Sequence, residues 1–366
     1  MSGFATEVLR GTDAILRGQE MLRGLAAGCG QEEAIADIHY YLDKPGLLQR
    51  TPVLLLIRRG GEPEQDNLAA AILLFEYKMA GIPLGLYTSN DRSGRRTVVA
   101  ASGERLDMAV RGVEHLLRHG ANVVMLTLRS AVIPEAVCDA LTRKTSGVSW
   151  LCRQREVPDY LELRPTYDAT LATIGKRTRT HMRYYRRRAE NEFGCTFDPQ
   201  LKTSERELIA FNWQCMYPVP QQVVAWRLRA LRQFERPTLM ALRDSDGHLL
   251  SVLGGRRFGR DSDVLWQMNR TGMERHSLSL VMRTYFIEQE ISCGTQRVYF
   301  DGGSSNSLLH SFARGVVTEF GALRHTPVSF IVRKIARRVI PRDNTLAHLL
   351  EQEDKSPASE PFLSTE

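Results

Sequence analysis

The sequence predicts an α/β (α+β) protein of two tandem units, each with a mixed, mostly antiparallel sheet flanked by helices. At 366 residues the chain is long for a single core, because domains usually hold about 100 to 200 residues. In both halves, short apolar runs bounded by glycine and charged turns alternate with helical patterns. The order of strands and helices in the second half repeats that of the first, although the residues themselves do not.

The composition is that of a folded protein with local basic patches. Hydrophobic residues make up 43% of the chain and charged residues 25%, which is typical of globular domains. The formal net charge of +7 arises from 49 basic and 42 acidic side chains, so both signs share the surface. An anionic partner is favoured, but a uniform polycation is excluded.

The six cysteines are scattered, with no C-x-x-C pair and no histidine at zinc-ligand spacing, so we expect reduced thiols and no metal site. The first 27 residues lack the apolar run of a signal peptide, and no stretch of eighteen apolar residues follows. The expected protein is soluble and cytoplasmic, without a membrane span.

The first unit is predicted over residues 1–162. It begins with a helix, because apolar residues from Phe4 to Leu25 form a broken stripe. Strands follow in "TPVLLLIRRG", "LAAAILLFEYKMAGIPLGLYTS" and "RRTVVAAS". The amphipathic helix "ERLDMAVRGVEHLLRHG" then leads into "ANVVMLTLRS", a nearly continuous apolar strand of the kind that is buried on both faces.

The second unit is predicted over residues 191–340. Two helices, "ERELIAFNWQCMY" and "QQVVAWRLRALRQF", precede three strands within residues 237–271. A helix at "SLSLVMRTYFIEQEIS", a strand at "TQRVYFDGG", a helix at "NSLLHSFARGVV" and a last strand near "VSFIV" complete it. Residues 341–366 form an extension whose polar, proline-rich end is predicted to be disordered.

Residues 163–190 contain the most basic stretch, "GKRTRTHMRYYRRRAE", which predicts a helix. An apolar stripe runs along one side of this helix, formed by Ile174, Thr178, Met182, Tyr185 and Ala189. A basic row lies beside it, formed by Lys176, Arg179, Arg183, Arg186 and Arg187. Guanidinium groups bind phosphate and carboxylate in bidentate fashion, so the row could hold a ligand; it could equally pair with acidic residues of the other half.

The order of meander, helix, parallel strand, helix and strand is similar to that of the GNAT acyltransferase fold. The segments "RTRTHMRYYRRRAE" and "QRVYFDGGSSNSLLHSFARG", on either side of the meander, resemble the CelD-like and FemAB-like branch. In that branch two GNAT-like domains commonly lie in tandem, with an arginine-rich helix between them. The resemblance spans roughly residues 40–330, and it is clearer in the second half than in the first.

The resemblance implies an acyl-CoA co-substrate, whose phosphates would meet the turn "NRTGMERHSLSL" at the start of a helix. The candidate residues there are Gly272, Arg275, His276, Ser277 and Ser279. This turn departs from the family, since Glu274 replaces part of the usual glycine-rich loop and would repel phosphate. An ordinary helix cap formed by Ser277 explains the same residues.

Two residues are candidates for proton transfer. Asp301 ends the strand "RVYFD", and ligands of open α/β sheets bind beyond strand ends. His310 lies on the following predicted helix, where GNAT enzymes often place a tyrosine acid. The alternatives are ordinary ones: an aspartate before glycines is a common turn residue, and a single helical histidine is often just packed or exposed.

These observations predict transfer of an acyl group from acyl-CoA, acetyl-CoA foremost, to an amine or hydroxyl of a small metabolite or sugar. Arg179, Arg183 and Arg187 would hold an anionic part of donor or acceptor, in a cleft shared by the two units. Two alternatives stay open: a FemAB-like transferase that takes its aminoacyl group from tRNA, and a non-catalytic module of degenerate GNAT fold that binds an anionic ligand.

Overall fold

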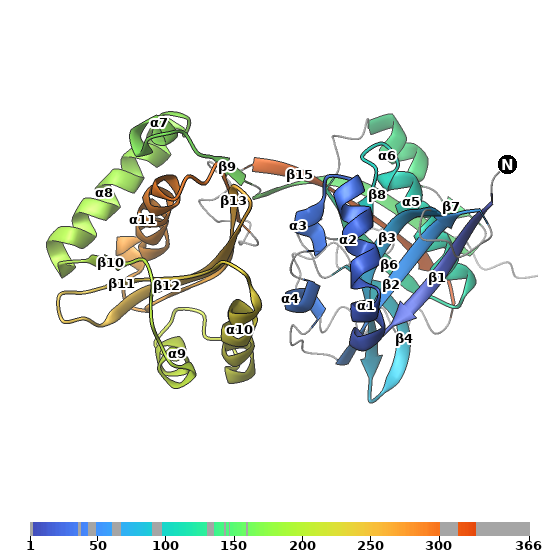
Figure 1. The fold of residues 1–366 in the computed structure, drawn as a ribbon, viewed down its shortest axis with the longest axis horizontal. Helices are drawn as coiled ribbons and strands as arrows, with labels where there is room; N and C mark the ends of the chain where they lie inside the picture. The colour runs from blue at the N-terminus through green and yellow to red at the C-terminus, as the bar shows by residue number, and fades with distance from the viewer. Residues whose placement is uncertain are drawn as a thin grey trace, which may run out of the picture.

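A computed structural model describes residues 3–35, 38–42, 49–60, 67–89, 97–129, 135–142, 144–145, 147–158, 160–300 and 314–326. These residues form two sheets flanked by helices, arranged side by side (Figure 1). Each sheet contains one parallel pair of strands, and its other pairs are antiparallel. The predicted fold class is therefore confirmed.

The first sheet has the strand order β1-β2-β3-β4-β6-β15-β8-β7, and β5 pairs with β3. Its parallel pair is β4 with β6, as the apolar strand after the amphipathic helix predicted. The strands are β1 (Phe4–Arg10), β2 (Gln49–Arg59), β3 (Leu68–Met79), β4 (Ile82–Thr88), β5 (Val98–Ala100), β6 (Val123–Leu128), β7 (Lys144–Thr145), β8 (Val148–Pro158) and β15 (Arg314–Arg324).

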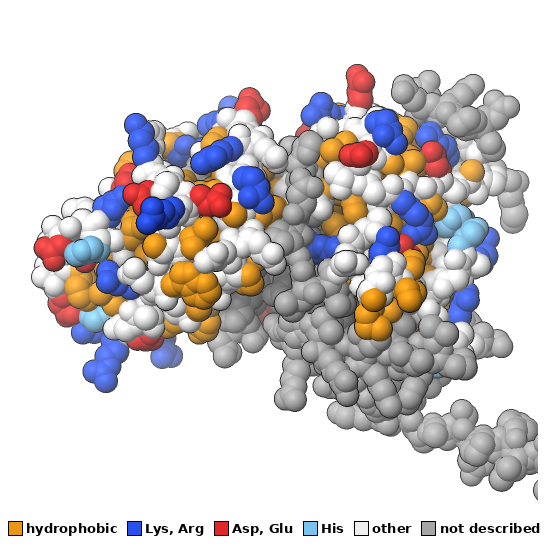
Figure 2. All heavy atoms as spheres, turned by 90° about the horizontal axis from the view of Figure 1, so that it is seen from below, with side chains coloured by type: hydrophobic (Ala, Val, Ile, Leu, Met, Phe, Trp, Pro, Cys, Tyr) orange, Lys and Arg blue, Asp and Glu red, His pale blue; other side chains and the backbone are white. Residues whose placement is uncertain are grey.

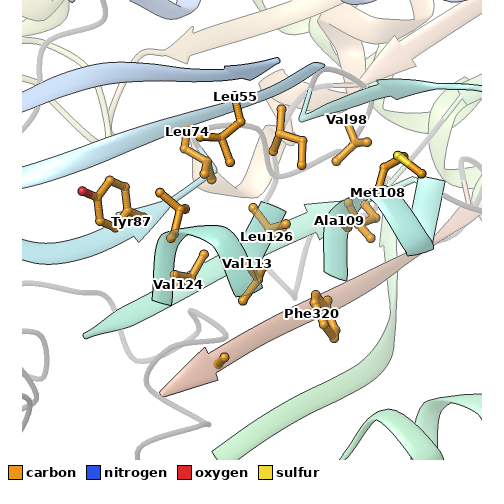
Figure 3. Close-up of a cluster of buried hydrophobic side chains, with 14 of the residues drawn as sticks. Leu55, Leu74, Tyr87, Val98, Met108, Ala109, Val113, Val124, Leu126 and Phe320 are labelled. Atoms are coloured by element: carbon orange, nitrogen blue, oxygen red, sulfur yellow. The ribbon is translucent and has the colours of Figure 1, made fainter. Parts of the chain in front are cut away.

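Helices cover both faces of the first sheet. One face packs against α5 (Arg105–Arg118) and α6 (Glu135–Leu141), and Figure 3 shows the side chains between α5 and the strands. The other face packs against the helices of the N-terminal segment, whose buried side chains include Ile15, Leu22 and Ile38. These helices are α1 (Thr12–Arg17), α2 (Gln19–Gly28), α3 (Glu32–Ile35) and α4 (Ile38–Leu42).

The second sheet has the order β10-β11-β12-β13-β14-β9. Its strands are β9 (Tyr160–Glu162), β10 (Thr196–Asp198), β11 (Pro237–Arg243), β12 (Leu249–Phe258), β13 (Asp261–Asn269) and β14 (Arg297–Phe300). One face packs against α7 (Tyr167–Ala172), α8 (Lys176–Phe193) and α11 (Leu278–Ser292). The other packs against α9 (Glu205–Asn212) and α10 (Gln221–Gln233).

The last described strand, β15, belongs to the first sheet. It pairs along its whole length with β8 and over six residues with β6. The sequence predicted a helix through residue 317, but Arg314–Val317 are the first residues of this strand. Valines and a phenylalanine in "RGVVTEF" fit a buried strand better than a helix. The strand predicted near "VSFIV" lies outside the described residues.

The opening stretch corrects a second prediction. Residues Phe4–Arg10 form β1, which pairs antiparallel with β2, and helix begins only at Thr12. Partly buried and exposed residues alternate over the first five positions of β1. That alternation has the two-residue period of a strand, which the longer apolar stripe concealed.

The two halves of the molecule contact each other through aromatic side chains. The ring of Tyr40, on α4, lies 4.6 Å from that of Trp226 and 5.7 Å from that of Phe234, both in the second half. Basic and acidic side chains are interspersed over the face shown in Figure 2, as the composition predicted. Among the described residues, no helix is long and apolar enough to cross a membrane.

Candidate functional site

The ends of β13 and β14 form the candidate site, where the pairing of the two strands in the described chain ends. They pair in parallel from Asp261 to Val264, opposite Arg297 to Phe300. Strand β13 then continues to Asn269, so its last five residues have no β14 partner in the described chain. In the described chain, no strand pairs with the edge of that stretch that faces away from β12, and backbone groups on this edge could bind a ligand.

A β-bulge sets which side chains face this site. Gly254 of β12 pairs with Trp266 and Gly255 pairs with Val264, which leaves Leu265 as the extra residue. Leu265 and Trp266 consequently both pack toward α9 and α10. A Cβ atom on Gly254 would lie 2.2 Å from the Trp266 ring, so only glycine fits there.

Polar side chains gather on the α11 side of β12 and β13, beyond the bulge. The Ser251 hydroxyl donates to Asn269 Oδ1 at 2.8 Å, and Gln267 Nε2 donates to the same oxygen at 3.0 Å. Gln267 Nε2 also lies 3.3 Å from the carbonyl oxygen of Ser279 at the start of α11. Gln267 Oε1 is shielded from solvent and accepts no hydrogen bond within the described chain. A ligand N–H could use this free acceptor.

Arg283 is the cation of this region, one turn beyond Ser279 on α11. Its Nε atom is shielded from solvent and has no hydrogen-bond partner in the described chain, and its guanidinium lies 5.9 Å from the ring of Phe300 on β14. Burial lowers the pKa of Arg283 to about 10. A partly buried cation with no anion in the described chain is costly, so an anionic ligand group would stabilise it.

The loop predicted to bind phosphate, residues 272–279, already holds a carboxylate. Glu274 accepts the backbone N–H of Gly272 at 3.0 Å and the hydroxyl of Thr271 at 3.4 Å. Hydrogen bonds from its own backbone N–H and that of Gly272 lower the pKa of Glu274. The carboxylate therefore accepts the hydrogen bond of a backbone N–H group that would otherwise be available to a phosphate.

The other predicted loop residues have different surroundings. His276 Nε2 lies 2.7 Å from a carboxylate oxygen of Glu192 and so ties the loop to α8. The Arg275 side chain is exposed, and its carbonyl oxygen accepts a 3.4 Å hydrogen bond from Arg188. Ser277 has a left-handed backbone, with φ 47° and ψ 49°, and its side chain makes no capping hydrogen bond. The cap that the sequence offered for this residue is not formed.

Helix α8 docks as the sequence predicted, with Thr178, Met182 and Ala189 buried. It packs mainly against α11, and it also contacts α7 and the short 3-10 helix η2 (Glu274–His276). Figure 1 places α8 on the side of the second sheet away from the first. The basic row therefore does not face a cleft between the two sheets, because the apolar stripe docks on α11 rather than at the domain boundary.

Carboxylates of the same half pair with several α8 arginines. Arg183 lies 2.8 Å from Asp168, Arg186 lies 2.8 Å from Glu288, and Arg188 lies 2.7 Å from Glu192. The guanidinium of Arg186 also lies 4.1 Å from the centre of the Tyr285 ring, whose hydroxyl donates to Glu190 at 2.6 Å. Among the described residues, Arg179 and Arg187 have no ion pair, so they remain open to a ligand.

Asp301 and His310 lie outside the described residues, so their roles stay predictions. The sequence reading missed Arg283, Gln267 and Asn269. A signal for Arg283 was present, because it is the only cation in "LSLVMRTYFIEQEIS", a helix that is otherwise largely buried. Arginine is rarely buried without a partner, so a lone arginine in such a run indicates a functional position.

In the described part of the chain, one group of side chains has the spacing of metal ligands. Asp244, Asp246 and His248 lie in the turn between β11 and β12, with their ligand atoms within 4.8 Å of one another. Asp244 Oδ1 already accepts the backbone N–H groups of Asp246 and His248, at 3.1 and 2.8 Å. These hydrogen bonds explain the cluster as a polar turn.

Comparison with known proteins identifies the fold. No family model and no curated protein sequence matches the chain. Among solved structures, FemX matches 89% of this chain and 99% of its own, with a TM-score of 0.51 and 10% identity. The chain shares the fold of FemX. L-PGS from Bacillus licheniformis also matches, over 87% of this chain and 96% of its own, with a TM-score of 0.47 and 10% identity.

A GCN5-related N-acetyltransferase from Sphaerobacter thermophilus matches 86% of this chain and 95% of its own, with a TM-score of 0.43 and 12% identity. At identities of this size, the likeness to FemX concerns the fold alone. It nevertheless covers both halves of the chain, including the first half, where the sequence pattern was weak.

Proposed function

We propose that this protein is a transferase that moves an acyl group from an acyl-CoA thioester to an amine or hydroxyl at the ends of β13 and β14. The observation that carries the proposal is the guanidinium of Arg283, which lies beside a strand end and has no anionic partner in the described chain, in a fold shared with FemX. In this proposal Arg283 binds an anionic group of a small acceptor. Arg183 is less suited to that role, because it pairs with Asp168.

The reaction needs an acceptor nucleophile, a polarised carbonyl and two proton transfers. The amine or hydroxyl attacks the thioester carbonyl, a C–N or C–O bond forms, and the C–S bond breaks. The acceptor loses a proton to a base, and the departing CoA sulfur gains one. Backbone N–H groups of β13 beyond Val264 are suited to stabilise the oxyanion, and Asp301 and His310 are the proposed proton carriers.

Isothermal titration calorimetry with acetyl-CoA and longer acyl-CoAs tests the donor. We expect saturable heat with at least one thioester, and weaker binding of free CoA if the acyl group itself is recognised. Circular dichroism of the same sample establishes that the protein is folded. The absence of heat with every thioester, on folded protein, would remove CoA from the proposal.

A second candidate is transfer of an aminoacyl group from tRNA. Two observations favour it: the carboxylate of Glu274 occupies the loop amide, and the outer side of α8 is basic. In the described chain, Arg177, Arg179 and Arg187 of α8 have no ion pair, and the Tyr184 ring, one turn from Arg187, is 49% exposed. Arginines next to an accessible ring are suited to an RNA backbone and its bases.

The absorbance of the purified protein at 260 nm distinguishes the two donors. If tRNA is the donor, the protein should carry RNA through a low-salt preparation, with a raised absorbance at 260 nm that high salt removes. RNA retention together with no acyl-CoA heat would select the aminoacyl-tRNA reaction. Acyl-CoA heat without RNA retention would select the thioester.

A further inference from the structure

A cavity of about 590 Å³ lies in the first sheet, in the part of the molecule for which the sequence predicted no site. It opens beside the starts of β4 and β6, at Gly85 and Asn122, and next to the end of α5, at Gly120. The candidate transferase site lies instead at the opposite, C-terminal ends of the parallel strands of the other sheet. The cavity is therefore not the counterpart of that site in the first half.

The size of the cavity fits a small metabolite, since ligand pockets usually measure about 300–1,000 Å³. Part of its wall is bare backbone. Gly85 and Gly120 have φ values of +63° and +95°, which only glycine adopts at low cost. A Cβ atom on Gly85 would lie 2.7 Å from the side-chain nitrogen of Asn122 and 3.3 Å from the Gly120 carbonyl oxygen, so side chains are excluded from this wall.

A fixed arginine lies at the base of the cavity. Arg10 Nη1 lies 2.6 Å from Glu76, and Arg10 Nη2 donates to the Tyr87 hydroxyl at 3.2 Å. The Tyr87 hydroxyl in turn donates to the other carboxylate oxygen of Glu76. Figure 3 shows the Tyr87 ring at the edge of the hydrophobic core with its oxygen pointing away from it. Glu76 is thus neutralised, while 48% of the Arg10 side chain stays exposed.

The remaining charge of the lining is positive. Lys78 lines the cavity and, in the described chain, makes no ion pair or hydrogen bond that would neutralise it. His119 Nδ1 donates to the carbonyl oxygen of His115 at 2.8 Å, and the His119 side chain is exposed. The last carbonyl groups of α5 accept backbone N–H groups, so they add few acceptors to the cavity.

We propose that this cavity binds a small organic anion through a phosphate or carboxylate group held by Arg10 and Lys78. Glu76 and Tyr87 position the Arg10 guanidinium, whose planar fork suits either anion. Lys78 supplies the charge that the Arg10–Glu76 pair does not. The strand β15 ends beside the cavity, where the Thr326 hydroxyl lies 3.2 Å from Asn122 Oδ1.

Differential scanning fluorimetry with inorganic phosphate, glycerol 3-phosphate and succinate, at constant ionic strength, tests the proposal. We expect at least one anion to raise the melting temperature of the full chain. A response to the phosphate compounds alone identifies a phosphate ligand, and a response to succinate alone identifies a carboxylate. Lys78→Gln should weaken the apparent affinity by about tenfold or more, because a hydrogen bond to a charged group contributes about 1.5–3 kcal/mol.

Two further variants control the test. Lys202→Gln removes an exposed lysine of the second half and should leave the response unchanged, and Lys78→Arg should restore it. Acyl-CoA binding should be the same in Lys78→Gln as in the natural sequence, which separates this cavity from the transferase site. A lack of response to all three anions, or an equal response in Lys78→Gln, would overturn the proposal.

Discussion

The guanidinium of Arg283 lies on a helix whose buried side chains are mostly apolar. Burial lowers its pKa, so the folded chain holds the charged form at a cost. Natural proteins keep such groups where a ligand gains from them, because a desolvated cation binds an anion more strongly than a solvated one does. Arg283 is therefore expected both to lower the stability of the fold and to strengthen the binding of an anionic ligand.

Replacing Arg283 with methionine should raise stability and lower function together. Methionine fills a similar volume without charge, so we expect the free energy of unfolding to increase by about 1–3 kcal/mol. Turnover, or acceptor binding, should fall by about tenfold or more. Urea denaturation and a steady-state assay measure the two effects. Arg283→Lys should recover part of the activity.

Arg232→Met is the matched control, because Arg232 is exposed on α10 and lies on the opposite face of the same sheet. It should change neither stability nor turnover appreciably. A purely structural role for Arg283 predicts the reverse pattern, in which Arg283→Met loses stability and keeps its turnover per folded molecule.

At the scale of single elements, the loop between β13 and α11 contains a carboxylate that binds one of the loop's own backbone N–H groups. The Glu274 side chain bonds the Gly272 amide, as a ligand oxygen would. The sequence indicated that Glu274 disfavours phosphate by repulsion, but it could not show that the carboxylate also occupies the donor. That contact depends on the backbone of Gly272, whose φ is +77°.

Glu274→Ala should therefore strengthen binding of a CoA donor. Removing the carboxylate frees the Gly272 amide and removes a negative charge, and each effect contributes on the order of 0.5–1 kcal/mol at an exposed site. The two effects together amount to about 1–2 kcal/mol, so we expect the dissociation constant measured by calorimetry to fall by about five- to thirtyfold. Glu288→Ala removes an acidic residue of α11 that is distant from the loop, and it should leave the dissociation constant unchanged. An unaltered constant in Glu274→Ala would place the donor phosphates elsewhere.

The elements differ in how far the sequence predicted them. Helix α8 was predicted with its buried side, since Thr178, Met182 and Ala189 repeat at helical spacing and pack as expected. Strand β1 was missed because its alternation covers only seven residues, whereas the helical pattern that follows in the sequence is longer. The polar set at the end of β13 was also missed, because the bulge at Leu265 changes which side chains face α11.

At the scale of the molecule, the chain returns from the second sheet to complete the first. Strand β15 lies between β6 and β8, and its residues Phe320 and Ala322 belong to the core around α5. A local apolar pattern predicts a strand but not its partners, so this pairing could not be predicted from the sequence. The carboxylate of Glu319 is buried in the same strand and pairs with Arg153 at 2.6 Å.

This arrangement makes the first sheet depend on residues that follow the candidate transferase site. Phe320 is fully buried, and its ring lies 5.6 Å from that of Trp150 on β8. Phe320→Ala should lower the free energy of unfolding by about 3–5 kcal/mol, the usual cost of removing a large core side chain. Hydrogen exchange should accelerate at the amides of β6 and β8, because each of these strands pairs with β15.

Val316→Ala is the control on the same strand, since its side chain is only partly buried and should cost about 1 kcal/mol or less. Trp150 fluorescence should report the loss in Phe320→Ala at lower urea than in either the control or the natural sequence. If β6 and β8 stay as protected in Phe320→Ala as in the control, β15 contributes little to the sheet, and the two halves fold without this link. If protection falls in both sheets together, the returning strand couples them into one cooperative unit, because losing it then unfolds the second half as well.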